Sequence, residues 1–242
     1  MKKVLLIDSG SGGLNVLHNC INSVKGCDFL LFCDNKNLPY GNKSKQELLD
    51  MTEHNLRVIK SFFDFDVVVF ACCTLTACCL QECQQAFPKV KFVGAVPPIA
   101  KAVEKYGQEN VVVVATENTI KHSGELSKYP NVEKVAMPHL AEQIDRNLGC
   151  IENVKSEFVD VGHSVKGCAV VLGCTHYSAV KGLIAEQLKP VEIFDVCDEV
   201  ANALKMVVGE GVKNGQLQIM TSKNDGFLAK LWQRLKEKQE DD

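Results

Sequence analysis

The sequence predicts an α/β protein of two doubly wound parallel-sheet lobes, related by pseudo-two-fold symmetry, with an active site in the cleft between them. Residues 66–74 and 168–176 are alike: each is an apolar run, then a small residue, a cysteine and a nearby threonine. Continuous apolar runs are typical of parallel strands buried on both faces. Such runs alternate with amphipathic stretches of helical length, which indicates βα units rather than hairpins.

Each expected element follows from this alternation. The run at 2–8 opens the chain as a strand, and a glycine loop then leads into an apolar helix. Further strands are expected at 28–33, 66–71, 90–95, 110–115, 132–136, 168–173, 191–196 and 216–221. Further helices are expected at 44–62, 75–87, 98–106, 152–164, 178–188, 197–209 and 225–238.

The division into lobes is inferred from the paired cysteine segments, because no Gly/Ser linker separates them. Two prolines interrupt the pattern at 94–98, where we expect the chain to cross into the second lobe. The return is expected near residue 207. The first lobe is therefore predicted to hold residues 1–94 and 208–242, and the second lobe residues 95–207.

Composition excludes several classes of protein. The 242 residues are 46% apolar, enough for a sizeable core, and the net charge of −3 provides no basic field for nucleic acid. No apolar run approaches the roughly 20 residues that span a bilayer, so we expect a soluble, cytoplasmic protein. The 12 cysteines include no Cys-x-x-Cys and no paired Cys/His spacing. A metal site or a disulfide scaffold is therefore not expected.

Two loops at predicted strand ends are candidates for ligand binding. In Asp8–Gly13, glycines let backbone amides approach an anion near a helix start, which suits a small carboxylate. The alternative is a plain turn with Asp8 as a capping residue. In the loop 34–44, Tyr40 and Gly41 offer a hydroxyl and an accessible amide, although Pro and Gly also mark ordinary turns.

The two cysteine segments carry the strongest chemical signal. Cys72 is expected at a strand end facing a helix start, where the helix dipole would lower the pKa of its thiol. Thr74 or Thr76 would cap that helix or hold a ligand. Cys174 is followed two residues later by His176, whose imidazole can accept or stabilise a thiol proton. Two thiols facing each other across a cleft suit removal of a proton from one face of a carbon and its return on the other.

With these motifs the chain resembles glutamate racemase of the aspartate/glutamate racemase superfamily. The family shows an Asp-Ser-Gly-x-Gly-Gly loop, a Pro-Tyr-Gly-Asn-Lys-Ser loop, an Ala-Cys-Asn-Thr thiol and a Gly-Cys-Thr-His thiol. The matching segments here are Asp8–Gly13, Pro39–Ser44, Ala71–Thr74 and Gly173–His176, with weaker matches at 116–119 and 195–201. Cys73 departs from the family pattern, which has Asn at that position.

The resemblance implies an enzyme that interconverts L- and D-glutamate without cofactor or metal, supplying D-glutamate for peptidoglycan. Cys72 and Cys174 would be the acid/base thiols, assisted by Asp8 and His176 respectively. A family glutamate near that histidine corresponds to Glu142. The partners implied are the amino-acid substrate and a second copy in a homodimer, without nucleic acid or membrane. Substrate contacts would come from Asp8, Ser9, Tyr40, Gly41, Cys73, Thr74, Thr175 and His176.

Three other functions stay open. An enzyme with the same fold and the same two thiols would act on aspartate, a hydantoin or maleate instead. A weakened contact at Cys73 makes a non-catalytic dicarboxylate-binding protein conceivable, because a thiol is a poor hydrogen-bond partner compared with an amide. A redox thiol protein is a further alternative, although the chain lacks Cys-x-x-Cys.

Overall fold

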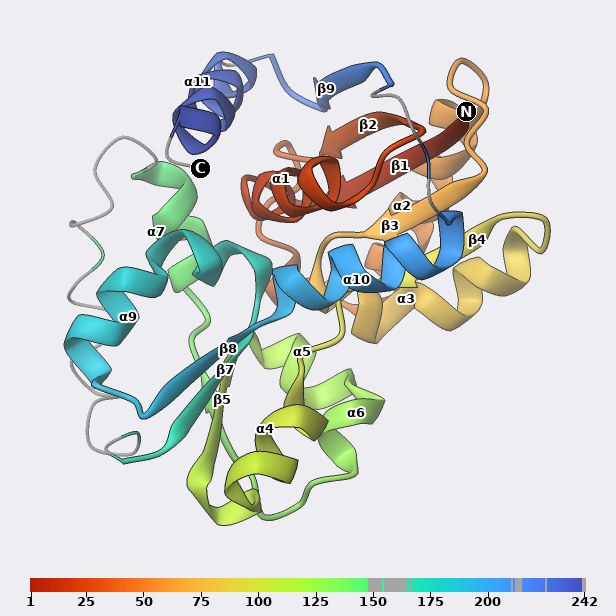
Figure 1. Cartoon of the computed structure of the whole chain (residues 1–242). Coiled ribbons are helices and arrows are strands. Elements are labelled where there is room, and N and C mark those ends of the chain that lie inside the picture. Colours follow the sequence, from red (N-terminus) through yellow and green to blue (C-terminus); the bar gives the residue numbers. More distant parts are fainter. Residues whose placement is uncertain are drawn as a thin grey trace.

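The structure is a computed structural model that describes residues 1–147, 154, 165, 167–209, 211, 215–224 and 226–240. Its strands form two separate parallel sheets, one in each lobe (Figure 1). The strands are β1 (Lys2–Asp8), β2 (Cys27–Cys33), β3 (Val67–Phe70), β4 (Lys91–Gly94), β5 (Val111–Ala115), β6 (Glu133–Ala136), β7 (Ala169–Gly173), β8 (Glu192–Asp195) and β9 (Leu217–Thr221). Every predicted strand is confirmed to within about two residues.

Helices follow most strands, as expected for βα units. They are α1 (Gly12–Ser23), α2 (Lys45–Lys60), α3 (Cys73–Ala86), α4 (Ile99–Tyr106), α5 (Glu117–His122), α6 (Gly124–Ser127), α7 (Leu140–Arg146), α9 (Lys181–Leu188), α10 (Val196–Val208) and α11 (Phe227–Glu240). Short 3-10 helices are η1 (Tyr40–Asn42), η2 (Gln108–Asn110) and η4 (Thr175–Val180). The predicted helix at 152–164 lies outside the described residues, apart from residue 154.

The two sheets share one strand order. The first runs β4-β3-β1-β2-β9 and the second β6-β5-β7-β8. When the strands of each lobe are numbered in chain order, both sheets contain the strand order 2-1-3-4. The chain reverses direction across the sheet between β1 and β3, and again between β5 and β7. These reversals are the switch points beside which open α/β sheets bind ligands. The predicted pairing of two similar lobes is confirmed.

Strand register places the two cysteines at equivalent points. Ile7 pairs with Phe70, so Asp8 and the segment leading to Cys72 leave the first sheet side by side. Ala115 pairs with Gly173, so residue 116 and Cys174 leave the second sheet together. Each thiol thus follows the third strand of its lobe, at the carboxyl edge.

Both faces of each sheet are covered, which explains the continuous apolar runs. Leu6 and Val69 belong to one core cluster of the first lobe, and their neighbours Ile7 and Phe70 belong to another on the opposite face. The second sheet has the same arrangement. Burying each such side chain contributes about 1.5–3 kcal/mol. These cores make each sheet a rigid support for the loops at its edge.

The chain crosses between lobes twice. After β4 it passes through Pro97 and Pro98 into α4, and after β8 it returns through α10, which packs against α1 (Figure 1). β9 then pairs in parallel with β2. The lobe boundaries near residues 95 and 207 stay a prediction. Among the described residues, no helix combines the length and apolar character needed to cross a membrane.

Candidate active site

Asp8 lies at the end of β1 with its carboxyl group fully buried. Its Oδ1 accepts a hydrogen bond from the Gly10 amide at 2.7 Å, and its Oδ2 accepts one from the Thr175 hydroxyl at 3.2 Å. Burial raises the pKa of Asp8 to about 6, although the nearby imidazole of His176 opposes this shift. Asp8 is not the cap of α1, because Ser11 occupies that position.

The glycines of this loop permit close approach of the two lobes. A Cβ atom on Gly10 would overlap the carboxylate of Asp145, and one on Gly12 would overlap the ring of His176 and the hydroxyl of Thr175. Each of these partners belongs to the second lobe. Gly10 and Gly12 are therefore required by packing between the lobes, a reason that the sequence alone does not reveal.

Cys72 is the N-cap residue of α3, with extended backbone angles, and is buried. The pKa of its thiol is raised well above its ordinary value by burial and then by the charge of Asp8. Backbone amides of Thr74 and Leu75 oppose that shift but do not reverse it. The prediction that the helix start lowers this pKa is wrong, because desolvation and a carboxylate outweigh the dipole. A charge on Cys174 also raises the pKa of Cys72, so the two thiols lie within electrostatic reach.

The second thiol and its histidine lie together as the sequence predicts. Cys174 Sγ is 3.9 Å from His176 Nδ1, and both side chains are buried. His176 Nε2 lies 3.3 Å from Oδ2 of Asp145 and 3.8 Å from Oδ1 of Asp8. Burial lowers the pKa of His176, but the two carboxylates outweigh burial and raise it well above its ordinary value. The two carboxylates therefore favour the form of His176 that carries a proton on both nitrogens.

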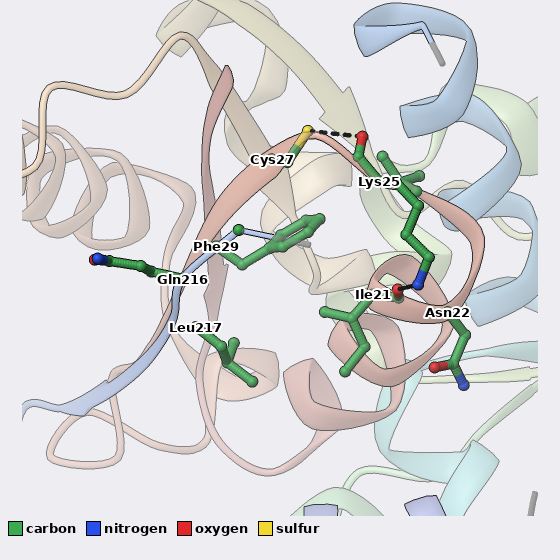
Figure 2. A pocket seen from close by; sticks show the side chains of 9 residues that line it. Ile21, Asn22, Lys25, Cys27, Phe29, Gln216 and Leu217 are labelled. Atoms are coloured by element: carbon green, nitrogen blue, oxygen red, sulfur yellow. Dashed lines mark hydrogen bonds between the residues drawn. The ribbon is translucent and has the colours of Figure 1, made fainter. Parts of the chain in front are cut away.

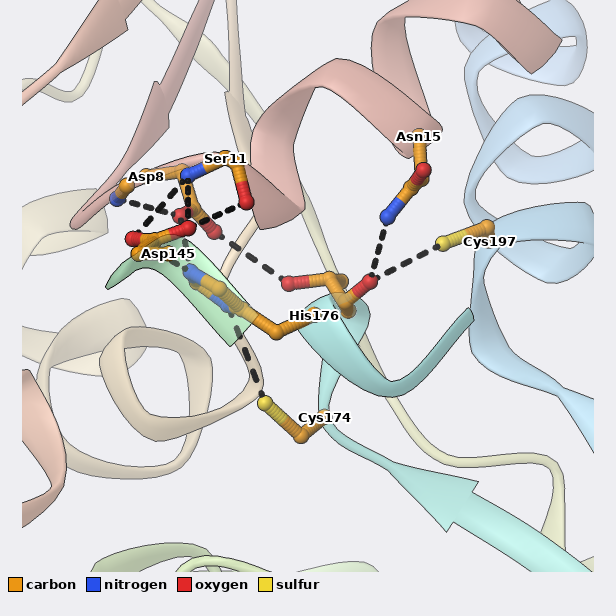
Figure 3. A network of polar contacts seen from close by, with 9 residues as sticks. Asp8, Ser11, Asn15, Asp145, Cys174, His176 and Cys197 are labelled. Atoms are coloured by element: carbon orange, nitrogen blue, oxygen red, sulfur yellow. Dashed lines mark hydrogen bonds and ion pairs between the residues drawn. The ribbon is translucent and has the colours of Figure 1, made fainter. Parts of the chain in front are cut away.

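Asp145 is the residue that sequence reasoning missed. It lies on α7, is buried, and accepts hydrogen bonds from the backbone amide and the hydroxyl of Ser11 across the lobe boundary (Figure 3). Glu142, one helical turn earlier, instead accepts a hydrogen bond from Arg146 on the half-exposed side of α7. Asp145 is the carboxylate of α7 that lies 3.3 Å from His176 Nε2. Residues three apart share a helix face, so the sequence alone does not say which of the two carboxylates contacts the histidine. A place for Glu142 in the site stays a prediction.

A threonine cluster joins the two lobes beside Cys73 in the sequence. Thr74 Oγ1 lies 2.8 Å from Thr116 Oγ1 and 3.4 Å from Thr119 Oγ1. Thr74 belongs to the first lobe, and Thr116 and Thr119 to the second. Asn118 also donates to the backbone carbonyls of Tyr40 and Lys43 across the boundary. The weaker match to the family motifs, at residues 116–119, thus lies at the candidate site.

The remaining predicted residues lie near these groups. Ser9 is buried next to Asp8, and a Cβ atom on Gly41 would lie 3.2 Å from Thr116 Cβ. The hydroxyl of Tyr40 donates to Asp34 Oδ2 at 2.7 Å, a partner within its own lobe that sequence reasoning did not foresee.

Cys73 is the first residue of α3 and is buried. Burial and then the charge of Cys174 raise the pKa of its thiol well above its ordinary value. Together with Thr76, Thr119 and Ser123 it lines a pocket at the lobe junction. Cys73 and Thr119, a member of the threonine cluster, thus line the same pocket.

A second pocket illustrates why the cysteine site is the stronger candidate. Ile21, Phe29 and Leu217 line it, together with Lys25, whose amine donates to the Ile21 carbonyl (Figure 2). It lies beside the start of β2, the end of the sheet opposite to Asp8. Ligands in open α/β sheets bind at the carboxyl edge instead. Within the described residues, no group of histidines, cysteines and carboxylates is arranged to hold a metal ion.

Known proteins resemble this chain over most of its length. A scan against protein-family models gives no match. Glutamate racemase of Carboxydothermus hydrogenoformans is 31% identical over 242 residues, covering 93% of this chain and 89% of that protein. Glutamate racemase of Clostridium acetobutylicum is 29% identical over 248 residues, covering 95% of each.

A solved structure shows the same fold. The Escherichia coli glutamate racemase, in complex with L-glutamate and the activator UDP-MurNAc-ala, superposes with a TM-score of 0.84 at 21% identity. The superposition covers 98% of this chain and 94% of that one. The length of the aligned regions and the identity to the curated relatives lead to one conclusion. The chain belongs to the glutamate racemase family of isomerases.

Proposed function

We propose that this protein interconverts L- and D-glutamate by a two-base mechanism, with Cys72 and Cys174 acting on opposite faces of Cα. The observation that carries the proposal is the equivalent placement of the two thiols. Each follows the third strand of its lobe, and they lie within electrostatic reach of each other. Family membership supports glutamate as the substrate. The product D-glutamate would serve peptidoglycan synthesis.

The groups around each thiol suit its part in the proton transfer. One cysteine, as thiolate, removes the α-proton, and the other, as thiol, returns a proton to the opposite face; the roles exchange in the reverse direction. His176 holds a proton at Nδ1, 3.9 Å from Cys174 Sγ, and can exchange it with that thiol. Asp8 has a pKa of about 6 and its charge reaches Cys72, so it can orient that thiol or accept its proton.

Removal of an α-proton beside a carboxylate needs strong stabilisation of the developing charge. Oriented amide and hydroxyl donors in a water-poor site provide it. The proposed donors are the buried hydroxyls of Ser9 and Thr74. The Thr175 hydroxyl and the amides of Gly10 and Ser11 donate to Asp8 and Asp145, and would reach the substrate only by exchanging those partners. These side chains, with Tyr40, Gly41 and Cys73, are the proposed contacts for the carboxylates and amine of the substrate. The reaction as proposed uses side-chain acids and bases alone.

The test is circular dichroism of D-glutamate incubated with the protein and no added cofactor. We expect the signal to decay to zero as the racemic mixture forms, with one solvent deuterium incorporated at Cα per turnover in D2O. Aspartate, a hydantoin and maleate, tested in parallel, identify the substrate. Thermal stabilisation by glutamate without any change in optical signal would contradict catalysis and indicate a binding protein instead. Light scattering tests the homodimer that the family resemblance implies.

A further inference from the structure

The backbone carbonyl of Thr175 is held from outside its own lobe. It accepts a hydrogen bond from Nδ2 of Asn15 at 2.9 Å, between residues 160 positions apart in the sequence. The thiol of Cys197, at the start of α10, lies 4.0 Å from the same oxygen. Figure 3 shows both side chains directed at this carbonyl. Thr175 is the residue between Cys174 and His176, so its peptide unit joins the thiol to the imidazole.

Asn15 is well placed to fix that peptide unit. It is 5% exposed and lies in the first turn of α1, the helix that begins directly after the Asp8 loop. α1 packs against both η4 and α10. A hydrogen bond in such a buried setting is strong, and its loss removes the amide donor that ties this carbonyl to the first lobe. The thiol of Cys197 is a weaker donor than an amide.

The position of Thr175 determines the positions of both neighbouring groups. Its hydroxyl donates to Asp8 and its carbonyl accepts from Asn15, so the first lobe holds this residue at two points. Cys174 and His176 are bonded to it on either side. A shift of this turn would therefore move the sulfur and the imidazole together, relative to Cys72 in the other lobe.

We propose that Asn15 is a positioning residue that aligns Cys174 and His176 with the first lobe, and so sets the separation of the two thiols. It acts through the Thr175 carbonyl and touches neither thiol. The inference rests on the proposed function for its kinetic consequence, but the alignment itself is independent of the substrate.

The test compares Asn15→Leu, which keeps the branched shape and the number of side-chain heavy atoms but removes the donor, with Asn15→Ala. The matched control is Asn19→Ala: Asn19 lies one turn later on α1 and donates to Asp198 of α10 at 2.8 Å, away from the thiol turn. Misplacement of a catalytic group by about 1 Å costs about 100-fold in rate. We therefore expect both Asn15 variants to lower kcat by about 10- to 100-fold with KM close to that of the wild type. Asn19→Ala is expected to leave kcat unchanged.

A second readout does not depend on racemisation. Iodoacetamide labelling, followed by mass spectrometry of the peptides, gives the alkylation rate of Cys174 relative to Cys72. Releasing the Thr175 carbonyl is expected to raise this ratio in both Asn15 variants and not in Asn19→Ala. An unchanged ratio in a folded Asn15 variant, or a kcat equal to that of the wild type, contradicts the inference. A wild-type protein inactive on glutamate would contradict the proposed function, while the labelling ratio would still test the alignment.

Discussion

Nε2 of His176 lies 3.3 Å from Oδ2 of Asp145, and the same carboxylate accepts hydrogen bonds from Ser11 in the other lobe. One buried side chain therefore orients the imidazole beside Cys174 and joins the lobes. Because the charges of Asp145 and Asp8 raise the pKa of His176, the imidazole stays protonated at pH values where a free histidine is neutral.

Replacing Asp145 by asparagine removes one of these charges and keeps the shape. We expect the pKa of His176 to fall, so that it loses its proton at lower pH than in the wild type. The alkaline limb of the kcat–pH profile should then move to lower pH, and kcat should fall by about 10- to 100-fold, as for the loss of other groups that orient a catalytic histidine. The measurement is the pH dependence of kcat.

Glu142→Gln is the matched control, since Glu142 lies on the same helix but pairs with Arg146 at the surface. Its profile is expected to coincide with that of the wild type. A shift as large as that of Asp145→Asn would mean that the site includes Glu142 after all.

Asp8 makes stability depend on pH in the mildly acidic range. Its folded pKa is about 6, above the value of 3.8 expected in the unfolded chain, so the folded state binds the proton more tightly. The stability that this proton contributes is present below pH 3.8 and is lost as pH rises to about 6. The loss amounts to about 3 kcal/mol at 1.36 kcal/mol per pKa unit. Urea unfolding of the wild type and of Asp8→Asn between pH 4 and 6 tests this.

As pH rises from 4 to 6, the free energy of unfolding of the wild type should fall relative to that of Asp8→Asn. Parallel curves for the two proteins would show that Asp8 is ionised normally in the folded state.

Gly12 is expected to tolerate no side chain. A Cβ atom there would overlap the ring of His176 and the hydroxyl of Thr175, so Gly12→Ala forces the lobes apart. We expect at least about a 10-fold loss of kcat and a lower melting temperature. Gly124→Ala is the control, because a Cβ atom at Gly124 meets nothing within 4 Å. Equal kcat values for the two variants would contradict the close approach of the lobes.

Cys73 is proposed to contact the substrate rather than to act as an acid or base. Loss of its contact should cost about 1 kcal/mol, which corresponds to less than about a 10-fold change in kcat/KM for Cys73→Ala. Steady-state kinetics on glutamate provide the measurement. A loss as deep as that of Cys72→Ala would show that the acid/base thiol is the second cysteine of the pair.

The sequence predicts much of the scaffold because buried parallel strands leave an unmistakable apolar pattern. The central strands β3, β5 and β7 show that pattern along their whole length, and Cys72 and Cys174 follow two of them as predicted. The outer strands β6 and β9 are only partly buried and match the prediction in position rather than in pattern. The short helices α5, α6 and α7 were not predicted, because segments of four to seven residues show too little periodicity.

Contacts between the lobes were beyond sequence reasoning. Asp145 and Asn15 reach partners more than 130 positions away, and local pattern says nothing about such pairs. Tyr40 illustrates the same limit, because local pattern does not predict that its hydroxyl donates to Asp34. The pKa of Cys72 could not be predicted either, since it depends on burial and on the charge of Asp8 in the folded protein.

The most direct test of the two-thiol mechanism is the rate of loss of the circular dichroism signal of D-glutamate with Cys72→Ala and Cys174→Ala. General acid–base groups contribute about 100- to 10,000-fold each, and each thiol serves one face of the substrate. We therefore expect each single variant to lose at least about 1,000-fold in kcat while remaining folded. Racemisation near the wild-type rate by either variant would contradict the assignment of the two thiols.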